Sequence, residues 1–457
     1  MTERRLRDDA LEIWKAGVEA VEADELVFAA LAGCAAEIAS SRRVAVVGAG
    51  KATTAMARAA EAFILSHGQA DLVGWVNVPD ATVEKLSNIH VHGARKLPDN
   101  RPTAEGVEGS KKILEIARAL GEEDLLIVLI SGGGSSLLPL PVDGVTLEDK
   151  LLITKLLQER GATIGEMNCV RKHLSKIKGG RLAQATKARI VTLIVSDVIG
   201  DPLDVIASGP TAPDPTTFEQ AVVVIDSNDL RDKIPRAALR HLDAGVRGEI
   251  PESPKELSDR VTNVVIGNNA TARRAAVDRA ETRGYRVLDA GEFDGDTQAT
   301  AARHARSLPS RRKVCVISGG ETTVNLGGAF GKGGRNQEFA LTVLNELGAD
   351  GVRGVCVLCG GTDGEDGPTN AAGAFVDEEL ARAAIAKGLD PADFLRRHDA
   401  YNFFEPLGGL VTTGPTDTNV MDLRVALIDR TEGAAVPALA APKSKAASAV
   451  VDPKHLE

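Results

Sequence analysis

Short apolar runs recur along the chain, and each is followed by a glycine-rich or acidic turn and then by a stretch with helical periodicity. The runs cover residues 44–47, 125–130, 190–195, 264–266, 314–317 and 355–359. Near-continuous apolar strands that lead through a loop into a helix are typical of parallel sheets covered on both faces. The pattern predicts an α/β protein with mainly parallel sheets, and such sheets bind ligands at the carboxyl ends of their strands.

The first forty residues repeat apolar positions at helical spacing and predict one or two amphipathic helices. A polar stretch with Gly248, Pro251 and Pro254 separates a helical pattern from a strand pattern farther along the chain. We therefore expect two α/β domains, residues 1–250 and 251–430. Residues 431–457 are rich in Ala, Pro, Ser and Lys and are expected to form a mobile tail.

Composition then narrows the classes of function. The 457 residues have a net charge of −10 and only 3% aromatic residues, which argues against a nucleic-acid partner. Because there is no apolar run of about 18 residues and no apolar core near the charged N-terminus, we expect neither a membrane span nor a signal peptide. Five irregularly spaced cysteines predict no disulfide framework, and we expect a reduced, cytoplasmic protein.

The most informative segment is Ser131-Gly132-Gly133-Gly134-Ser135-Ser136, which directly follows a predicted buried strand. Consecutive glycines let backbone amides turn toward an anion, and the serines add hydroxyl donors. The alternative is a turn that needs positive φ, but one glycine usually suffices for that. We interpret all six residues as candidates for binding a phosphate or a carboxylate.

Gly48, Gly50 and Lys51 follow another predicted strand and resemble a nucleotide-binding loop only in part. A Walker A loop requires glycine at Ala45 and a hydroxyl residue at Ala52. The dinucleotide fingerprint requires a third glycine that is absent here. A lysine at the tip of a parallel strand is nevertheless placed to meet a phosphate, and a solvated lysine is the alternative.

Two further segments of the first half contain candidate ligands. Asp197 ends a predicted strand and suits Mg²⁺, which prefers oxygen ligands, although capping of a turn is also a common role for aspartate. The basic stretch 168–181 includes Arg171 and Lys178 and predicts a patch that attracts a small polyanion. Its alternative is a solvated charged face. His173, within this stretch, is expected to be structural.

Candidates in the second half also follow predicted strands. Glu321 and Thr322 end the strand at 314–317, and Asp363 follows the strand at 355–359, where it can accept a proton from a hydroxyl or hold a metal. Glycines around Lys332 predict a loop that closes over a ligand, and Arg335 beyond it can bind phosphate oxygens or be an idle surface residue. The cysteines of the 355–359 strand are expected to pack in the core.

The ordered motifs GAGKA, SGGGSSL, NCVRKHLSKIKGGRLA, SDVIGDPLDVIASGPT, SGGETTV, GKGGRNQEFAL and GTDGEDGPTNAAGA resemble those of the class II glycerate kinases, also called the MOFRL family. The resemblance extends from about Arg43 to Ile428. It implies a Rossmann-like N-terminal domain, a smaller MOFRL domain, and a cleft between them in which ATP and Mg²⁺ serve to convert D-glycerate to 2-phosphoglycerate. Lys51, Arg335 and Asp363 match the residues assigned to catalysis in that family, and SGGGSS would be its anion-binding loop.

The resemblance has one departure, because residues 96–99 read Lys-Leu-Pro-Asp where many members have a His-Pro pair before Pro-Asp. The residues alone leave two other functions open. One is an NAD(P)H-dependent hydroxypyruvate reductase, and the other is a non-catalytic protein that binds an anionic metabolite. A homodimer is a further option that the residues do not decide.

Overall fold

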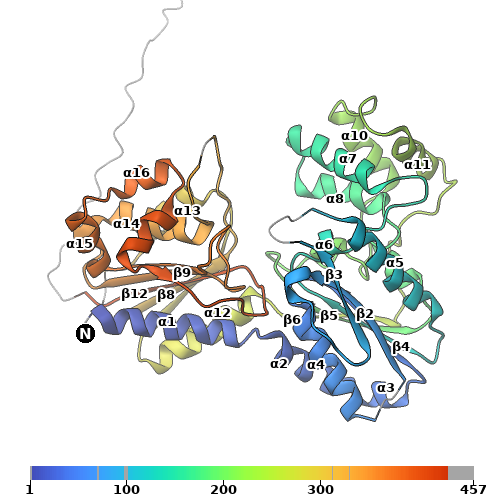
Figure 1. The fold of residues 1–457 in the computed structure, drawn as a ribbon, viewed down its shortest axis with the longest axis horizontal. Coiled ribbons are helices and arrows are strands. Elements are labelled where there is room, and N and C mark those ends of the chain that lie inside the picture. Colours follow the sequence, from blue (N-terminus) through green and yellow to red (C-terminus); the bar gives the residue numbers. More distant parts are fainter. Residues whose placement is uncertain (1–2, 69–70, 97–100, 311, 329, 431–457) are drawn as a thin grey trace, which may run out of the picture.

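The computed structural model describes residues 3–68, 71–96, 101–310, 312–328 and 330–430. Two α/β domains lie side by side (Figure 1). The predicted tail at 431–457 and residues 97–99 of the departure from the family pattern lie outside the described residues.

The first domain is built on a six-stranded sheet with the strand order β3-β2-β1-β4-β5-β6. Its strands are β1 (Val44–Ala49), β2 (Leu72–Pro79), β3 (Ile89–Arg95), β4 (Leu125–Ile130), β5 (Arg189–Val195) and β6 (Val261–Gly267). Neighbouring strands pair in parallel, and the central strands β1 and β4 are buried throughout. Because the order of the strands reverses between β1 and β4, a ligand-binding crevice is expected at the carboxyl ends of these two strands.

Helices cover both faces of the first sheet. One face packs against α2 (Ala23–Ala32), α3 (Ala35–Ser40) and α4 (Thr53–Ser66), and the other against α5 (Ala104–Ala119), α6 (Gly134–Leu137) and α9 (Arg181–Gln184). Two short 3₁₀ turns, η1 (Asp80–Thr82) and η2 (Ile206–Ser208), lie in connecting segments. A separate apolar core joins α7 (Leu147–Glu159), α8 (Ile164–His173), α10 (Phe218–Ser227) and α11 (Arg236–Val246), which form the upper part of the domain in Figure 1.

The second domain has a mixed six-stranded sheet with the order β11-β10-β9-β12-β8-β7. Its strands are β7 (Arg286–Phe293), β8 (Val314–Gly320), β9 (Val355–Gly361), β10 (Gly373–Val376), β11 (Leu410–Val411) and β12 (Asp422–Ile428). Only β7 and β8 pair in parallel among these strands. β12 inserts between β8 and β9 in the opposite direction, and β10 is antiparallel to both β9 and β11. The start of β12 therefore lies beside the carboxyl ends of β8 and β9.

Two groups of helices cover the second sheet. One face packs against α1 (Glu3–Glu19) and α12 (Asn269–Thr282). The other packs against α13 (Thr297–Ser307), α14 (Arg335–Gly351), α15 (Glu378–Ala386), α16 (Pro391–Arg396) and α17 (Ala400–Phe404), with the short turn η3 (Glu405–Leu407) after them. Cys356 and Cys359 of β9 are buried in the cores on opposite faces, which confirms the core packing predicted for them.

The division between the two sheets does not coincide with the predicted boundary near residue 250. Residues 261–267 form β6, which pairs with β5 and completes the first sheet. The chain crosses to the second domain at Asn269, where α12 begins, and α1 already packs on that domain. Proline and glycine mark the end of a helical segment here, but only strand pairing determines which sheet the next strand joins.

The structure confirms the α/β class and each apolar strand expected from the sequence, although the parallel pattern is complete only in the first sheet. The first forty residues form three helices rather than one or two. No helix in the described residues is long and apolar enough to cross a membrane.

Candidate active site

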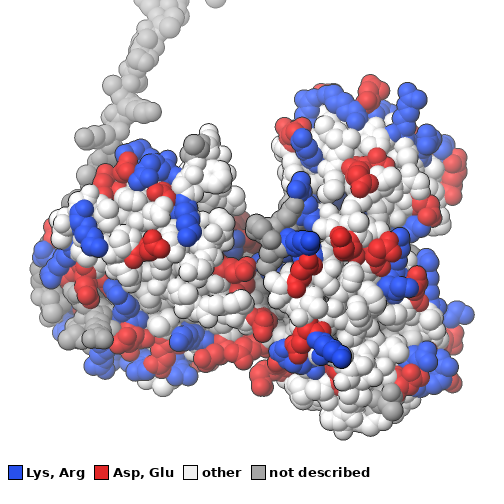
Figure 2. All heavy atoms as spheres, in the orientation of Figure 1, with Lys and Arg blue, Asp and Glu red and all other residues white. Residues whose placement is uncertain are grey.

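The two domains meet through an ion pair between predicted catalytic residues. Lys51 follows β1 of the first sheet, and Asp363 follows β9 of the second. The Lys51 Nζ atom donates to Asp363 Oδ2 over 3.0 Å and lies 3.9 Å from Glu365 Oε2. Both members of the pair remain partly exposed. Figure 2 shows a hollow between the two domains on the face that it presents. The structure thus brings together two charged groups that are 312 residues apart.

The glycine-rich loop after β4 holds Lys51 and Asp197 close to each other. The backbone amide of Lys51 donates to the Gly132 carbonyl over 2.8 Å. A Cβ atom on Gly132 would lie 2.5 Å from Asp197 Oδ2, so only glycine permits this carboxylate to approach the loop. Gly133 has φ +79°, and a side chain there would point toward Lys51 and Arg95.

Other members of the two glycine-rich loops serve to pack the loops together. A Cβ atom on Gly48 would collide with Leu129 of β4, and one on Gly50 would collide with Ser131 in the loop after β4. A Cβ atom on Gly134 would collide with Ala49 of β1. The buried Ser131 hydroxyl accepts from the Ala52 amide over 3.1 Å. These packing contacts by themselves require glycine at the three positions, whether or not the loops also bind a ligand.

Arg335 opens α14 and is held by two carboxylates. Its Nε atom donates to both oxygens of Asp422, at 3.0 and 2.9 Å, and its Nη1 atom donates to Glu321 Oε1 over 2.8 Å. The Asp366 carboxylate accepts from the backbone amides of Asn336 and Gln337, which satisfies the N-terminus of the helix. The guanidinium group is therefore fixed in place at the edge of the second sheet.

The charged groups from the two domains influence one another. Burial raises the pKa of Asp197, and the nearby Lys51 ammonium opposes this shift. Burial also raises the pKa of Glu321, against the effect of Arg335, and Asp422, Asp197 and Asp363 raise it further. Burial would lower the pKa of Arg335, but Asp422 and Glu321 raise it. The site thus combines cations with carboxylates that share one electrostatic environment.

The predicted basic residues Arg171 and Lys178 lie on the first domain at the far end of the same loop. Lys178 is buried, and its Nζ atom donates to the Ser135 carbonyl over 2.6 Å and to the hydroxyls of Ser135 and Ser208 over 2.8 and 3.2 Å. Arg171 donates from Nε to Thr154 Oγ1 over 3.3 Å. The glycine-rich loop therefore connects Lys51 at one end with a basic region at the other.

Ser136 and Thr322 make local contacts. Ser136 Oγ accepts from Arg95 Nη1 over 2.7 Å, and it donates to the Gly133 carbonyl. Thr322 is buried, and its hydroxyl accepts from Thr297 over 3.0 Å. Both nevertheless line cavities, Ser136 in the first domain and Thr322 beside Arg335 in the second.

Two other predictions concern residues away from the charged groups. His173 is buried and bonded to the Cys169 carbonyl and to Glu252, which confirms its structural role. In the glycine-rich loop before α14, Lys332 lies over the Tyr401 ring, 3.4 Å from its centroid, and its backbone amide donates to Asp399. The loop is thereby tied to the helices that follow it.

Sequence reasoning missed Asp422, Lys150 and Ser208. Asp422 is fully buried, and it binds Arg335, Asn336 and Arg424. It starts an ordinary apolar strand with no glycine-rich motif, so nothing local distinguishes it. Lys150 lies in an amphipathic helix, and only the packing of α7 against α8 brings it toward Arg171. The signal that could have found Asp422 is that an aspartate at the start of a buried strand requires a cationic partner.

Comparisons with known proteins agree with this arrangement. Residues 9–243 match the model of a domain of unknown function, DUF4147, and residues 314–422 match the MOFRL family model. The chain is 38% identical over 404 residues to the glycerate 2-kinase of Pyrococcus horikoshii, which covers 86% of this chain and 88% of that protein. It is 36% identical over 438 residues to the D-glycerate 2-kinase of Thermotoga maritima, with 93% and 98% covered. The crystal structure of a glycerate kinase from Thermotoga maritima is similar at a TM-score of 0.81 and 35% identity, covering 93% of this chain and 100% of that one.

Proposed function

Because the chain belongs to the glycerate kinase family, whose members it matches over most of their length, we propose that it phosphorylates D-glycerate to 2-phosphoglycerate, with ATP as donor and Mg²⁺ as the metal. The observation that supports this best is the meeting of Lys51 and Asp363 across the two domains, over 3.0 Å, beside a glycine-rich loop. Phosphoryl transfer requires positioning and neutralisation of charge more than covalent chemistry.

In the proposed reaction, Lys51 and Arg335 stabilise the equatorial oxygens of the phosphoryl group during its transfer. The 2-hydroxyl oxygen of glycerate forms a bond to the γ-phosphorus while the bond from that phosphorus to the β-phosphate oxygen breaks. The hydroxyl proton passes to Asp363. Lys51 binds Asp363 when no ligand is present. A phosphate that binds near Lys51 would compete for its ammonium group, and the Asp363 carboxylate would then be free to accept the hydroxyl proton.

The binding groups follow from the same arrangement. Backbone amides and hydroxyls of residues 131–136 bind anionic oxygens of the ligands, with Arg171 and Lys178 behind them and Gly48 and Gly50 shaping the loop before Lys51. Glu321 orients Arg335, to which it is bonded, and Thr322 supports the same strand end. Closure of the loop before α14 over the ligand is part of this proposal, and it would require Lys332 to leave the Tyr401 ring.

The carboxylates suit a magnesium ion that is shared with a nucleotide. No cluster of three or more acidic, histidine or cysteine side chains among the described residues is arranged to hold a metal by itself. Mg²⁺ in kinases is usually held by one or two carboxylates together with substrate phosphates. Asp197, half-buried beside the loop, is the residue that we assign to it, and the bound ion would neutralise charge on the phosphates.

A coupled assay tests the proposal. Purified protein is supplied with D-glycerate, ATP and Mg²⁺, and ADP is measured while the phosphoglycerate isomer is identified by NMR. We expect ADP and 2-phosphoglycerate in equal amounts. Oxidation of NADH with hydroxypyruvate, without formation of ADP, would instead identify a reductase. A cytoplasmic location and a homodimer also stay proposals, which fractionation and sedimentation would test.

A further inference from the structure

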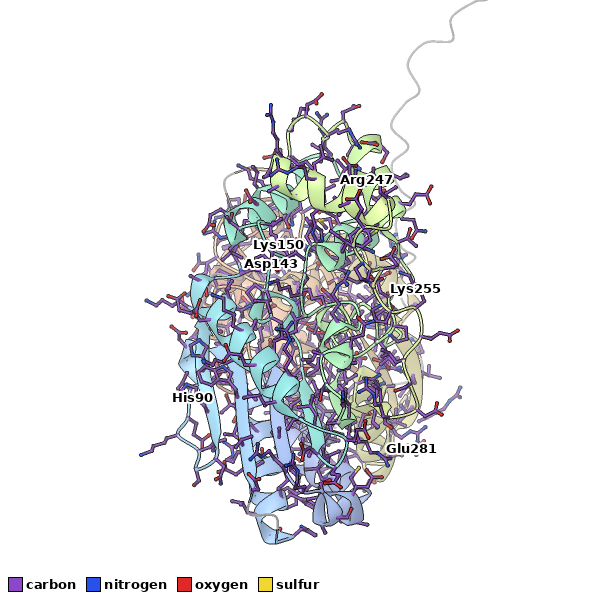
Figure 3. The ribbon with its side chains drawn as sticks, turned by 90° about the vertical axis from the view of Figure 1, so that its right-hand side faces the viewer. His90, Asp143, Lys150, Arg247, Lys255 and Glu281 are labelled. Atoms are coloured by element: carbon purple, nitrogen blue, oxygen red, sulfur yellow. The ribbon has the colours of Figure 1, made fainter. Side chains whose placement is uncertain are left out.

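A cavity of about 610 Å³ lies in the first domain, between α7, the following helix α8 and the glycine-rich loop. Its volume is within the usual range of small-molecule sites. Lys150 from α7, Arg171 from α8 and Lys178 line it together with the hydroxyl groups of Ser135 and Ser136. Figure 3 shows Lys150 between the first sheet and the helices at the top of the domain. Arg101 and Lys155 also line it, so all five charged residues of the lining are cations, in a chain whose net charge is −10.

None of the three cations Lys150, Arg171 and Lys178 has a carboxylate partner within the described residues. Lys150 Nζ donates to the Arg171 carbonyl over 3.4 Å, Arg171 donates to a threonine hydroxyl, and Lys178 donates to serine oxygens. The neighbouring buried Lys172 shows the contrast, because it is bound by Asp204 and Asp214 at 3.1 and 3.0 Å. Lys178 is buried, and Lys150 and Arg171 are partly buried. Cations removed from water are normally paired, so this set without carboxylate partners predicts an anionic ligand.

The electrostatics of the empty cavity agree with this geometry. Burial and the Arg171 guanidinium lower the pKa of Lys150 to about 7. Burial, Lys150 and Arg171 lower the pKa of Lys178 well below its usual value. The cations therefore repel one another without a ligand, and an anion among them would relieve this cost.

The cavity also has an apolar side and lies next to Lys51. Leu147, Leu151 and Leu152 of α7 also line it. The loop that supplies Ser135 accepts a hydrogen bond from the Lys51 amide at Gly132, three residues earlier. Three residues span at most ~10 Å, so one end of the cavity lies near the predicted site of transfer.

We propose that this cavity binds the nucleoside-phosphate donor, with its phosphates on Lys150, Arg171 and Lys178 and its base against the leucines of α7. The terminal phosphate then passes over Ser135 toward Lys51. The inference rests on the proposed function and specifies which of the two substrates occupies this cavity. Glycerate fits it poorly, because a single carboxylate on so small a molecule neither fills the volume nor matches three cations.

Isothermal titration of the full chain with ADP and with D-glycerate tests the assignment. The variants are Lys150→Met and Arg171→Met, and the matched control is Lys112→Met, an exposed lysine paired with Glu115 on α5. We expect each cavity variant to weaken ADP binding by about tenfold or more, as for loss of a charge-assisted hydrogen bond, and to leave D-glycerate binding unchanged. The control is expected to bind both ligands normally.

Unchanged ADP binding in both cavity variants, or an equal or larger loss for D-glycerate, would overturn the assignment. A second measurement, of tryptophan fluorescence, reports where ADP binds rather than how tightly it binds. Leu152 is 43% exposed and lines the cavity, so Leu152→Trp places an indole in its wall. ADP, but not D-glycerate, should change the emission of that indole, and an unchanged emission at saturating ADP would refute the proposal. Failure of the unmodified protein to phosphorylate glycerate would refute the function alone, since ADP binding is measured without turnover.

Discussion

The two domains hold their cations at the site in opposite ways. On the second domain, Arg335 is bound by Asp422 and Glu321, so its charge is matched before any ligand arrives. On the first domain, Lys150 and Lys178 have no carboxylate partner in the parts of the chain that the structure describes. A cation with matched charge is fixed in one geometry, whereas unmatched cations attract an anion. The comparison distinguishes a cation that is held in a fixed orientation, Arg335, from cations that are available to bind an anionic ligand, Lys150 and Lys178.

The largest expected effect concerns Lys51, which lies between these two extremes. Lys51→Ala should lower kcat by about 10³-fold or more, because a cation that faces the transferring phosphoryl group is lost. Its ion pair with Asp363 is partly exposed, so the melting temperature should change little. Steady-state kinetics and calorimetry on the same preparation measure both quantities. Near-normal turnover would remove Lys51 from the reaction, and Lys112→Ala is the surface control.

The second prediction concerns the carboxylates that neutralise Arg335 on the second domain. Asp422→Ala should lower the free energy of unfolding by about 3–5 kcal/mol, because the fully buried Arg424 would lose its carboxylate partner and Arg335 would keep only Glu321. Denaturant unfolding measures the change. Asp393→Ala removes a carboxylate from exposed ion pairs and serves as the control, with an expected change within about 1 kcal/mol. Equal stability of the two variants would show that the charges on this domain are not matched as described.

The third prediction compares two buried lysines six positions apart. Lys172→Met should destabilise the protein by about 3 kcal/mol, because the fully buried Asp214 loses its cation. Lys178→Met should change stability by less than about 1 kcal/mol, because it removes a buried cation that has no carboxylate partner in the described structure. Thermal unfolding of both variants measures these changes. A larger loss of stability in Lys178→Met than in Lys172→Met would contradict the prediction.

The smallest expected effect is a dependence on pH. Since the pKa of Lys150 is about 7, its charge is present below that pH and is lost above it, so anion affinity should fall as pH rises. The charged groups lining its cavity are Arg101, Lys155, Arg171 and Lys178, all of them cations. The advantage of the unmodified protein over Lys150→Met in ADP affinity should be about tenfold smaller at pH 8 than at pH 6. Titration of both proteins cancels the ionisation of ADP itself, and a constant ratio would contradict the prediction.

The fold was largely predictable where local pattern and pairing agree. The apolar runs at 125–130 and 355–359 became β4 and the first five residues of β9 because burial on both faces leaves a distinctive apolar sequence. The place of β12 was not predictable, because insertion between β8 and β9 depends on contacts made after a long connection. The assignment of 261–267 to the first sheet was missed for the same reason.

The residues of the candidate site were predictable where motif and strand end coincide. Lys51, Asp197, Arg335 and Asp363 all follow or adjoin glycine-rich segments, and the structure brings them to one region between the domains. Their catalytic roles stay predictions. Lys150 could not be identified, because its significance comes from the cations that face it from other elements.

The amino-acid sequence by itself determined the α/β class, the strand ends that present functional groups, and the residues typical of the family. These depend on periodicity and on turn chemistry, which act over a few neighbouring positions. Only the tertiary structure decided which charges are neutralised by a partner and which remain for a ligand. Electrostatic pairing depends on distance in space, and groups hundreds of residues apart, such as Lys51 and Asp363, become neighbours only after both sheets have formed.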